Sequence, residues 1–210
     1  MKKIIFLDLD GVARDSVRYV CNQYGVDLPK KYNEKINNKS FSELIDERAS
    51  VESPPTIFFD GILNICSQYG VKRYYISNNP YIKQNADWVL KHDREGIYVP
   101  VLKTVTKAEI VEDIVERKPK NGYLITIIDD CFQEIENYIK TLATFISQGT
   151  VILLLPDYPY NQSEQYKGFY GRFYKPEEVY NKLYSIYGVK NEVLEEELNK
   201  LEARNEHKRL

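Results

Sequence analysis

Two pairs of aspartates follow two apolar segments of the chain. The first segment reads IIFLDLDGV and places Asp8 and Asp10 directly after an apolar run, with Gly11 completing a turn. The second reads YLITIIDD and places Asp129 and Asp130 after another such run. If the two runs are neighbouring strands of a parallel sheet, their ends lie roughly 5 Å apart. The spacing therefore predicts one acidic site built from two strand ends.

A cluster of carboxylates of this kind needs a positive charge beside it. Without one, the acids repel each other and their pKa values rise. A hard divalent cation removes this penalty, and carboxylate oxygens are ligands that suit magnesium. Magnesium held in this way typically keeps several waters and recruits substrate phosphate. We therefore expect Mg²⁺ as the cofactor of this site.

Phosphate chemistry also needs donors and positive charge for the phosphoryl oxygens. Ser77 and Asn78 follow another apolar segment, RYYISNN, as hydroxyl and amide donors. Lys107 opens the helical pattern KAEIVEDIVER, where the amino end of a helix adds attraction for an anion. Taken alone, each motif is common in turns and at helix starts. Their placement at strand ends and helix starts is what favours a shared site.

The elements that must position these residues are apolar, β-rich segments separated mostly by helical patterns. The expected strands are 3–7, 73–76, 97–102, 123–128 and 150–155. The expected helices include 61–69, 82–92, 107–117 and 133–141. Alternation of this kind indicates an α/β fold with a parallel five-stranded sheet flanked by helices. In open sheets of this class ligands bind beyond the carboxyl ends of the strands, which is where the acids lie.

The alternation breaks once, because the chain between the first two strands is longer than one crossover helix needs. Helical patterns there cover 16–24, ending at Gly25, and 41–48, with Ser40 as the N-cap. We interpret residues 15–55 as a small helical insertion, and 1–14 with 56–188 as the core domain. A helix beginning at Pro176 should close one flank of the sheet. Residues 189–210 are a charged helix or tail that docks, dimerises the chain or frays.

The composition excludes several classes of protein. The chain has 210 residues, enough for a sizeable core, and no apolar run long enough to span a bilayer. A net charge of −2 argues against duplex nucleic acid as a partner. Three cysteines without CxxC spacing argue against a zinc site and fit a reducing compartment. Because Asp8 and Asp10 interrupt the first apolar run, we interpret it as a strand rather than a signal peptide and expect a cytoplasmic protein.

The order of the motifs resembles that of a known superfamily. DLDGVARDS, ISNN, a later lysine and IIDD are similar to the four motifs of the haloacid dehalogenase-like (HAD) phosphatases. The resemblance covers residues 3–161. It implies a Rossmann-like parallel sheet with the first strand central, and a small helical cap at 15–55. It also implies hydrolysis of a small-molecule phosphate monoester through an aspartyl-phosphate.

The resemblance implies a role for each motif residue. Asp8 is the expected nucleophile. Asp10 is expected to protonate the leaving oxygen and then to deprotonate the water that hydrolyses the intermediate. Ser77 with Asn78 beside it, and Lys107, are expected to bind the phosphoryl oxygens.

The resemblance also implies a set of magnesium ligands. These are Asp8, the backbone carbonyl of Asp10, Asp129, and Asp130 acting through water. The lysine has two alternatives, Lys103 and Lys118. Lys118 leaves no room for a helix before the second acid pair, whereas Lys107 begins a helix that leads back into the sheet.

The substrate is left open between several readings of the sequence. Pro159-Tyr160-Asn161 after the fifth strand, with the small cap, resembles the 5'(3')-deoxyribonucleotidase branch and favours a (deoxy)nucleoside monophosphate. Cap aromatics stack on the base in that branch, a role open here to Phe41, Tyr19 and Tyr32, although packing is the commoner role of such residues. The alternatives are a sugar phosphate, another small metabolite or a polynucleotide end. A further alternative is a binding protein without turnover, against which the intact motif residues argue.

Overall fold

The computed structural model describes residues 1–30, 34–36, 38–102, 104–117, 122–161 and 170–188. Within them a parallel sheet runs in the order β3-β2-β1-β4-β5-β6. The strands are β1 (Lys2–Asp8), β2 (Lys72–Ser77), β3 (Ile97–Pro100), β4 (Tyr123–Ile128), β5 (Val151–Pro156) and β6 (Tyr170–Phe173). The parallel α/β architecture is therefore as expected, and β1 lies inside the sheet between β2 and β4.

The sheet has six strands in the described part of the chain, so the expectation of five was wrong. β6 is short and pairs with β5 from Leu153 opposite Tyr170 to Pro156 opposite Phe173. Its sequence, YGRF, lies in a tyrosine-rich stretch and is too short for a period-two pattern to stand out. The ring of Phe173 is buried and meets that of Phe58 edge-on at 4.9 Å. Tertiary packing, rather than local pattern, makes this segment a strand.

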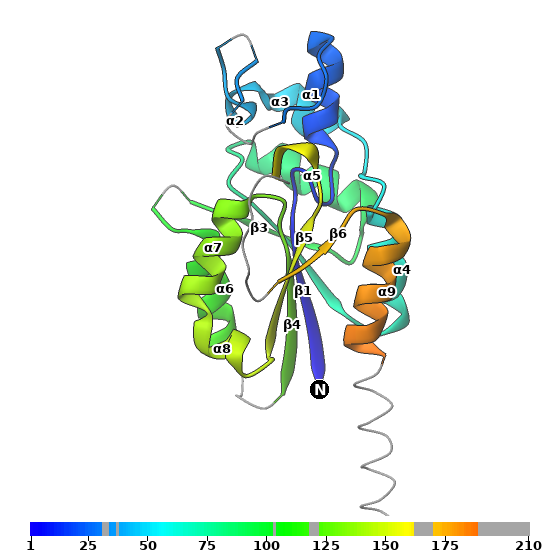
Figure 1. Cartoon of the computed structure of the whole chain (residues 1–210), viewed down its shortest axis with the longest axis vertical. Helices are drawn as coiled ribbons and strands as arrows, with labels where there is room; N and C mark the ends of the chain where they lie inside the picture. The colour runs from blue at the N-terminus through cyan, green and yellow to red at the C-terminus, as the bar shows by residue number, and fades with distance from the viewer. Residues whose placement is uncertain (31–33, 37, 103, 118–121, 162–169, 189–210) are drawn as a thin grey trace, which may run out of the picture.

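Two layers of helices enclose the sheet (Figure 1). One face carries α4 (Phe59–Gln68), α5 (Ile82–His92) and α9 (Pro176–Tyr187), and the other carries α6 (Lys107–Glu116), α7 (Phe132–Thr141) and α8 (Ala143–Ser147). Ile5 and Leu7 of β1 pack toward the first group, whereas Ile4 and Phe6 pack toward the second. Because both faces of β1 are covered, its sequence is apolar throughout rather than alternating.

The predicted helices agree with α4, α5, α6, α7 and α9 to within one turn, whereas α8 was not predicted. In the part of the chain that the structure describes, no helix is both long and apolar enough to cross a membrane. The predicted tail, 189–210, lies outside the described residues.

Among its described residues, the segment between β1 and α4 holds three short helices, α1 (Ser16–Tyr24), α2 (Phe41–Leu44) and α3 (Glu47–Glu52). α1 ends at Gly25 in the left-handed conformation, and Ser40 begins α2 in a capping box, both as expected. The predicted single helix over 41–48 was wrong, because the chain becomes extended at Ile45. Asp46 then accepts a hydrogen bond from the backbone N–H of Ala49 at 2.8 Å and begins α3 as its N-cap.

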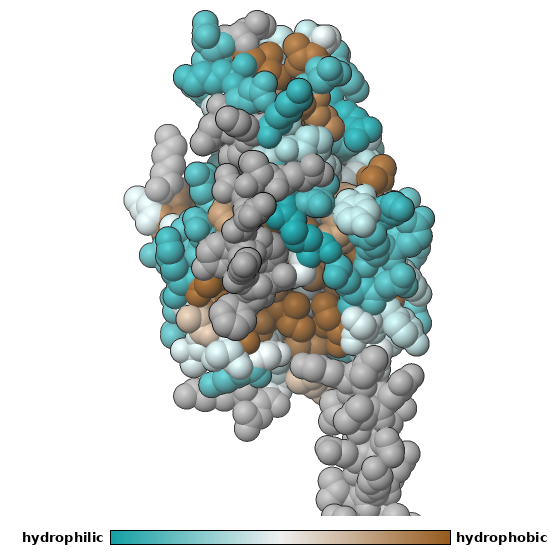
Figure 2. Space-filling model, viewed as in Figure 1, coloured by the Kyte–Doolittle hydropathy of each residue, from teal (hydrophilic) through white to brown (hydrophobic). Residues whose placement is uncertain are grey.

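The helices α1–α3 lie beyond the carboxyl ends of the strands, at the top of Figure 1. Figure 2 shows apolar residues reaching the surface among hydrophilic ones in the same region. The two segments that join these helices to the sheet run side by side. The backbone N–H of Thr56 donates to the carbonyl of Ala13 at 2.9 Å, and the backbone N–H of Asp15 donates to the carbonyl of Pro54 at 2.8 Å. The division of the chain at residues 15 and 55 stays a prediction.

Candidate active site

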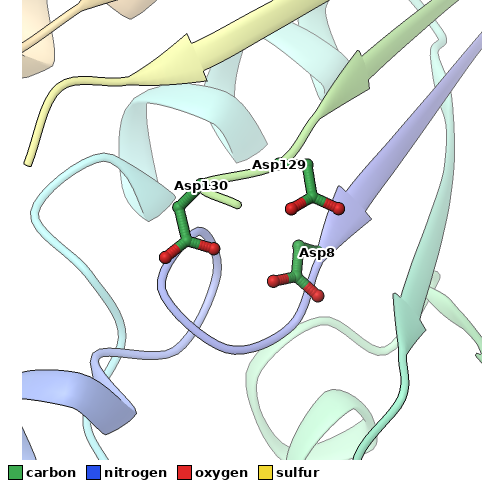
Figure 3. Close-up of side chains that lie close together, drawn as sticks. All are labelled: Asp8, Asp129 and Asp130. Carbon is green, nitrogen blue, oxygen red and sulfur yellow. The ribbon is translucent and has the colours of Figure 1, made fainter. Parts of the chain in front are cut away.

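Asp8, Asp129 and Asp130 come together at the carboxyl ends of β1 and β4 (Figure 3). Leu7 lies opposite Ile128 in the register of these neighbouring strands, so the residues that follow reach the same level. Carboxylate oxygens of Asp8, Asp129 and Asp130 all lie within 4.8 Å of one another. All three residues are buried. The structure thus brings the two acid motifs together at the carboxyl edge of the sheet.

Lys107 lies against two of these carboxylates. Its Nζ donates to Asp8 Oδ1 at 2.8 Å and to Asp129 Oδ2 at 2.9 Å, and the residue is 4% exposed. Thr106 caps α6 in a capping box with Glu109, which places Lys107 in the first turn. Burial disfavours the charge on Lys107, but the adjacent carboxylates outweigh burial and hold its pKa well above the ordinary value. The alternatives Lys103 and Lys118 lie outside the described residues.

The buried acids of the cluster have raised pKa values. Burial raises the pKa of Asp8 well above its ordinary value, and Lys107 offsets the shift only in part. Burial also raises the pKa of Asp129. The pKa of Asp130 rises to about 7, first because of burial and then because of the charge on Asp129. One ammonium group therefore does not compensate these acids fully.

The chemistry of the cluster fits a divalent cation. Its buried oxygens belong to carboxylates, which are the ligands that hard cations such as Mg²⁺ prefer. The hydroxyl of Tyr138 is also buried, has no hydrogen-bond partner among the described residues, and interacts electrostatically with Asp129 and Lys107. A buried polar group without a protein partner usually contacts an ordered water or an ion. The residues present are therefore suited to magnesium.

Asp10 lies beside the cluster and faces the end of β2. Its Oδ2 lies 3.4 Å from Ser77 Oγ and 3.3 Å from Asn79 Nδ2, both of which donate to it. The backbone N–H of Asn79 also donates to Ser77 Oγ at 3.0 Å. Asn78 is exposed and donates to Glu134 Oε1 at 3.0 Å instead. Ser77 thus lies where it was expected, but sequence reasoning missed Asn79, because only the turn after β2 decides which asparagine faces Asp10.

Residues of the turn after β5 support Asp130 through contacts that the sequence did not predict. The 3₁₀ turn Pro159–Asn161 brings the hydroxyl of Tyr160 within 2.5 Å of Asp130 Oδ2. Asn161 Nδ2 donates to the Asp130 carbonyl at 3.0 Å, and Arg172 of β6 donates to the Asn161 carbonyl at 2.8 Å. In the sequence, Pro159-Tyr160-Asn161 resembles a segment of the deoxyribonucleotidase branch. In the structure, Tyr160 and Asn161 hold Asp130 in place.

Gly11 allows the loop after β1 to pass close to Asp130. Its φ is +89°, and a Cβ at this position would lie 2.2 Å from Asp130 Oδ2. Neither the backbone conformation nor the space suits another residue. We therefore expect Gly11→Ala to lower the free energy of unfolding by about 3 kcal/mol, because strain and steric overlap add. Urea denaturation would measure this loss.

Gly25 provides the matched control, since its φ is also positive, at +64°, but a Cβ there would meet nothing within 4 Å. We expect Gly25→Ala to cost about 1 kcal/mol, which is the conformational penalty alone. Equal losses for Gly11→Ala and Gly25→Ala would contradict the close approach to Asp130.

A cavity of about 170 Å³ opens over the site. Its polar lining includes Asp8, Asp10, Ser77, Lys107 and Asp130, together with Asn78, Asn79, Glu134 and Tyr160. The segment between β1 and α4 contributes apolar residues, which are Val17, Pro29, Phe41 and Ile45. The cavity therefore combines a charged floor with an apolar wall.

The three aromatic candidates for a base contact differ in position. Phe41 lines the cavity and also packs in the small apolar cluster formed by α1–α3. Tyr19 packs in that cluster as well, and its hydroxyl donates to Glu52 at 2.6 Å. Tyr32 lies outside the described residues. Phe41 is therefore the candidate that the structure places at the cavity.

Comparison with known proteins bears on the fold. No protein-family model and no curated protein matches the chain. Among solved structures, the HAD domain of the effector protein Lem4 from Legionella pneumophila, an inactive mutant, matches with a TM-score of 0.50 and 17% identity, covering 92% of this chain and 98% of that one. A HAD-superfamily hydrolase from Ehrlichia chaffeensis matches with a TM-score of 0.51 and 11% identity, covering 89% and 98%. The chain therefore shares its overall fold with these two structures.

Proposed function

We propose that this protein is a magnesium-dependent phosphatase that hydrolyses phosphate monoesters through an aspartyl-phosphate on Asp8. The observation that carries the proposal is the buried contact of Asp8 with Lys107, beside Asp129 and Asp130, at the floor of a cavity. Asp10 lies at the same floor, within reach of Ser77. A HAD-type fold supports this function because it accounts for the order of the four motifs.

Asp8 is oriented for attack by two donors. The backbone N–H of Leu9 and the Nζ of Lys107 both donate to Asp8 Oδ1, at 2.9 and 2.8 Å. We propose that Oδ2 therefore forms the new bond to phosphorus while the bond from phosphorus to the ester oxygen breaks. Asp10 gives its proton to that leaving oxygen. It then takes a proton from the water that attacks the aspartyl-phosphate, so phosphate is released, Asp8 returns to a carboxylate and Asp10 is protonated again.

The phosphoryl oxygens need donors that are already in place. We propose that Ser77 and Lys107 bind them, with Asn78 or its neighbour Asn79 as the amide donor. Asp8, the backbone carbonyl of Asp10 and Asp129 would hold magnesium, with Asp130 acting through water. When bound, the ion supplies positive charge that offsets the charge of the phosphoryl group.

We propose a nucleoside monophosphate as the substrate, because Phe41 and the apolar wall offer a surface to a base. The size of the cavity favours a second candidate. About 170 Å³ is small beside the roughly 300–1,000 Å³ of typical ligand pockets, which suits a sugar phosphate or another compact metabolite.

The test of the function is release of phosphate from an aryl phosphate, with and without magnesium. We expect release with Mg²⁺ and its loss when a chelator is added. A protein that releases no phosphate in the presence of Mg²⁺ would refute the proposal and favour a binding role without turnover.

A panel of purine and pyrimidine 5'- and 3'-monophosphates against sugar phosphates then separates the two substrates. Higher kcat/KM on the nucleotides would support the first candidate. Equal values throughout the panel would contradict it.

A further inference from the structure

Arg14 is a buried charge for which the mechanism above has no role. It lies in the segment between β1 and α1 and is 0% exposed. It is among the largest fully buried side chains of the described residues. Its guanidinium contacts one acid directly. Nε and Nη2 both donate to Asp10 Oδ1, at 3.0 and 2.7 Å. A single carboxylate oxygen of Asp10 is thus held by two donors of one rigid group.

Three other groups fix the guanidinium in turn. Nη1 donates to the backbone carbonyl of Ser50 in α3, and Nη2 donates to Asn85 Oδ1 in α5 at 3.0 Å. The guanidinium carbon also lies 5.8 Å from the centre of the Trp88 ring, whose indole N–H donates to the carbonyl of Ser53 at 2.8 Å. Arg14 therefore cannot turn without breaking contacts with both α3 and α5.

Stability alone is a weak reason for such an arrangement. Removing a guanidinium from water costs free energy that offsets most of its attraction to a carboxylate. The contacts instead fix the orientation of the Asp10 carboxylate. Because Arg14 holds Oδ1 of Asp10, the other oxygen, Oδ2, faces Ser77 and Asn79, which line the cavity.

We infer that Arg14 is the positioning residue of Asp10. By holding Oδ1, it fixes the position of Oδ2, the oxygen that transfers the proton, relative to α3 and α5. This inference rests on the proposed function, because it assigns Asp10 a proton transfer. Transfer of a proton depends on a carboxyl oxygen held within hydrogen-bond reach, and small displacements cost large factors in rate. Through the Ser50 carbonyl, the position of α3 becomes part of the geometry of Asp10.

The test compares Arg14→Met with Arg48→Met, using release of phosphate from an aryl phosphate in the presence of Mg²⁺. Arg48 lies on α3, is 67% exposed and pairs with Glu52, so its replacement should leave kcat unchanged. We expect Arg14→Met to lower kcat by about 30-fold while KM changes by less than about threefold, because the chemical step and not binding is affected.

A double-mutant cycle separates positioning from a merely structural role. If Arg14 acts through Asp10, then Arg14→Met should cost less than about threefold in kcat when Asp10→Asn is already present. An equal cost in both backgrounds would overturn the inference. Arg14→Lys, which keeps the charge but loses the fork, should recover kcat to within about tenfold of the wild type.

Folding of each variant is checked by thermal unfolding. If Arg14→Met does not fold, Arg14→Lys carries the same cycle with Asp10→Asn, and additive losses would again overturn the inference. A wild-type protein without activity would refute the proposed function and the inference together. An active wild type with an unimpaired Arg14→Met would overturn the inference alone.

Discussion

Asp8→Asn is expected to abolish phosphate release, lowering kcat by roughly four orders of magnitude or more. An amide oxygen is a far weaker nucleophile than a carboxylate, so no aspartyl-phosphate can form at a useful rate. The asparagine has the same shape and can still accept the hydrogen bonds of Leu9 and Lys107 through its oxygen. The loss should therefore be chemical rather than structural.

Two measurements check this result. Single-turnover assays with an aryl phosphate give the rate. Trapping with labelled substrate should show a phosphorylated protein, labile to hydroxylamine, in the wild type and not in Asp8→Asn. The matched control is Asp60→Asn on α4, an exposed aspartate on which no change in kcat is expected. An Asp8→Asn variant that keeps kcat within tenfold of the wild type would mean that another group attacks phosphorus.

The acid cluster could be predicted from the sequence because its position follows from a local pattern. An apolar run that ends in aspartate identifies a strand end, and parallel strands bring such ends to one edge. Asp8 and Asp129 meet on these grounds alone. Lys107 was also within reach of local reasoning, since the start of a helix that leads back to the sheet lies at the same edge.

Other parts of the site depend on turns and tertiary contacts that leave no mark in local sequence. Nothing in the SNN motif tells which asparagine turns to Asp10, and the structure selects Asn79. Arg14 reads as one more charged residue in a loop, yet it is buried by groups more than thirty positions away. Tyr160 likewise acquires its contact with Asp130 only when β5 and β4 are paired.

The same limit applies to the fold. β6 is a strand because it pairs with β5 and because Phe173 is buried in the core. Its four residues alone predict neither contact. The predicted helix over 41–48 is divided because Asp46 accepts a hydrogen bond from the backbone N–H of Ala49 and so begins α3 as its N-cap. Local pattern thus predicted the long elements, whereas β6 depends on contacts distant in sequence and the division between α2 and α3 on a single helix cap.

Lys107→Met is expected to reduce both stability and activity. Lys107 is buried between Asp8 and Asp129, and its removal leaves two buried carboxylates without their partner. Breaking a buried ion pair in this way costs about 3–5 kcal/mol of the free energy of unfolding. Since Lys107 is also a proposed donor to the phosphoryl group, kcat should fall by roughly 10²–10³. Urea denaturation without magnesium and the aryl phosphate assay with it measure the two effects.

Lys83→Met on α5 is the matched control, because Lys83 is 84% exposed and pairs with Asp87 at the surface. Such a pair contributes at most about 1 kcal/mol. The double variant Lys107→Met with Asp8→Asn sharpens the test, since removing one of the two stranded charges should restore part of the lost stability. Lys107→Met should not unfold like the wild type, and the stability losses of Lys107→Met and Asp8→Asn should not simply add. The opposite outcome of either measurement would contradict the view that Lys107 offsets repulsion among the buried acids.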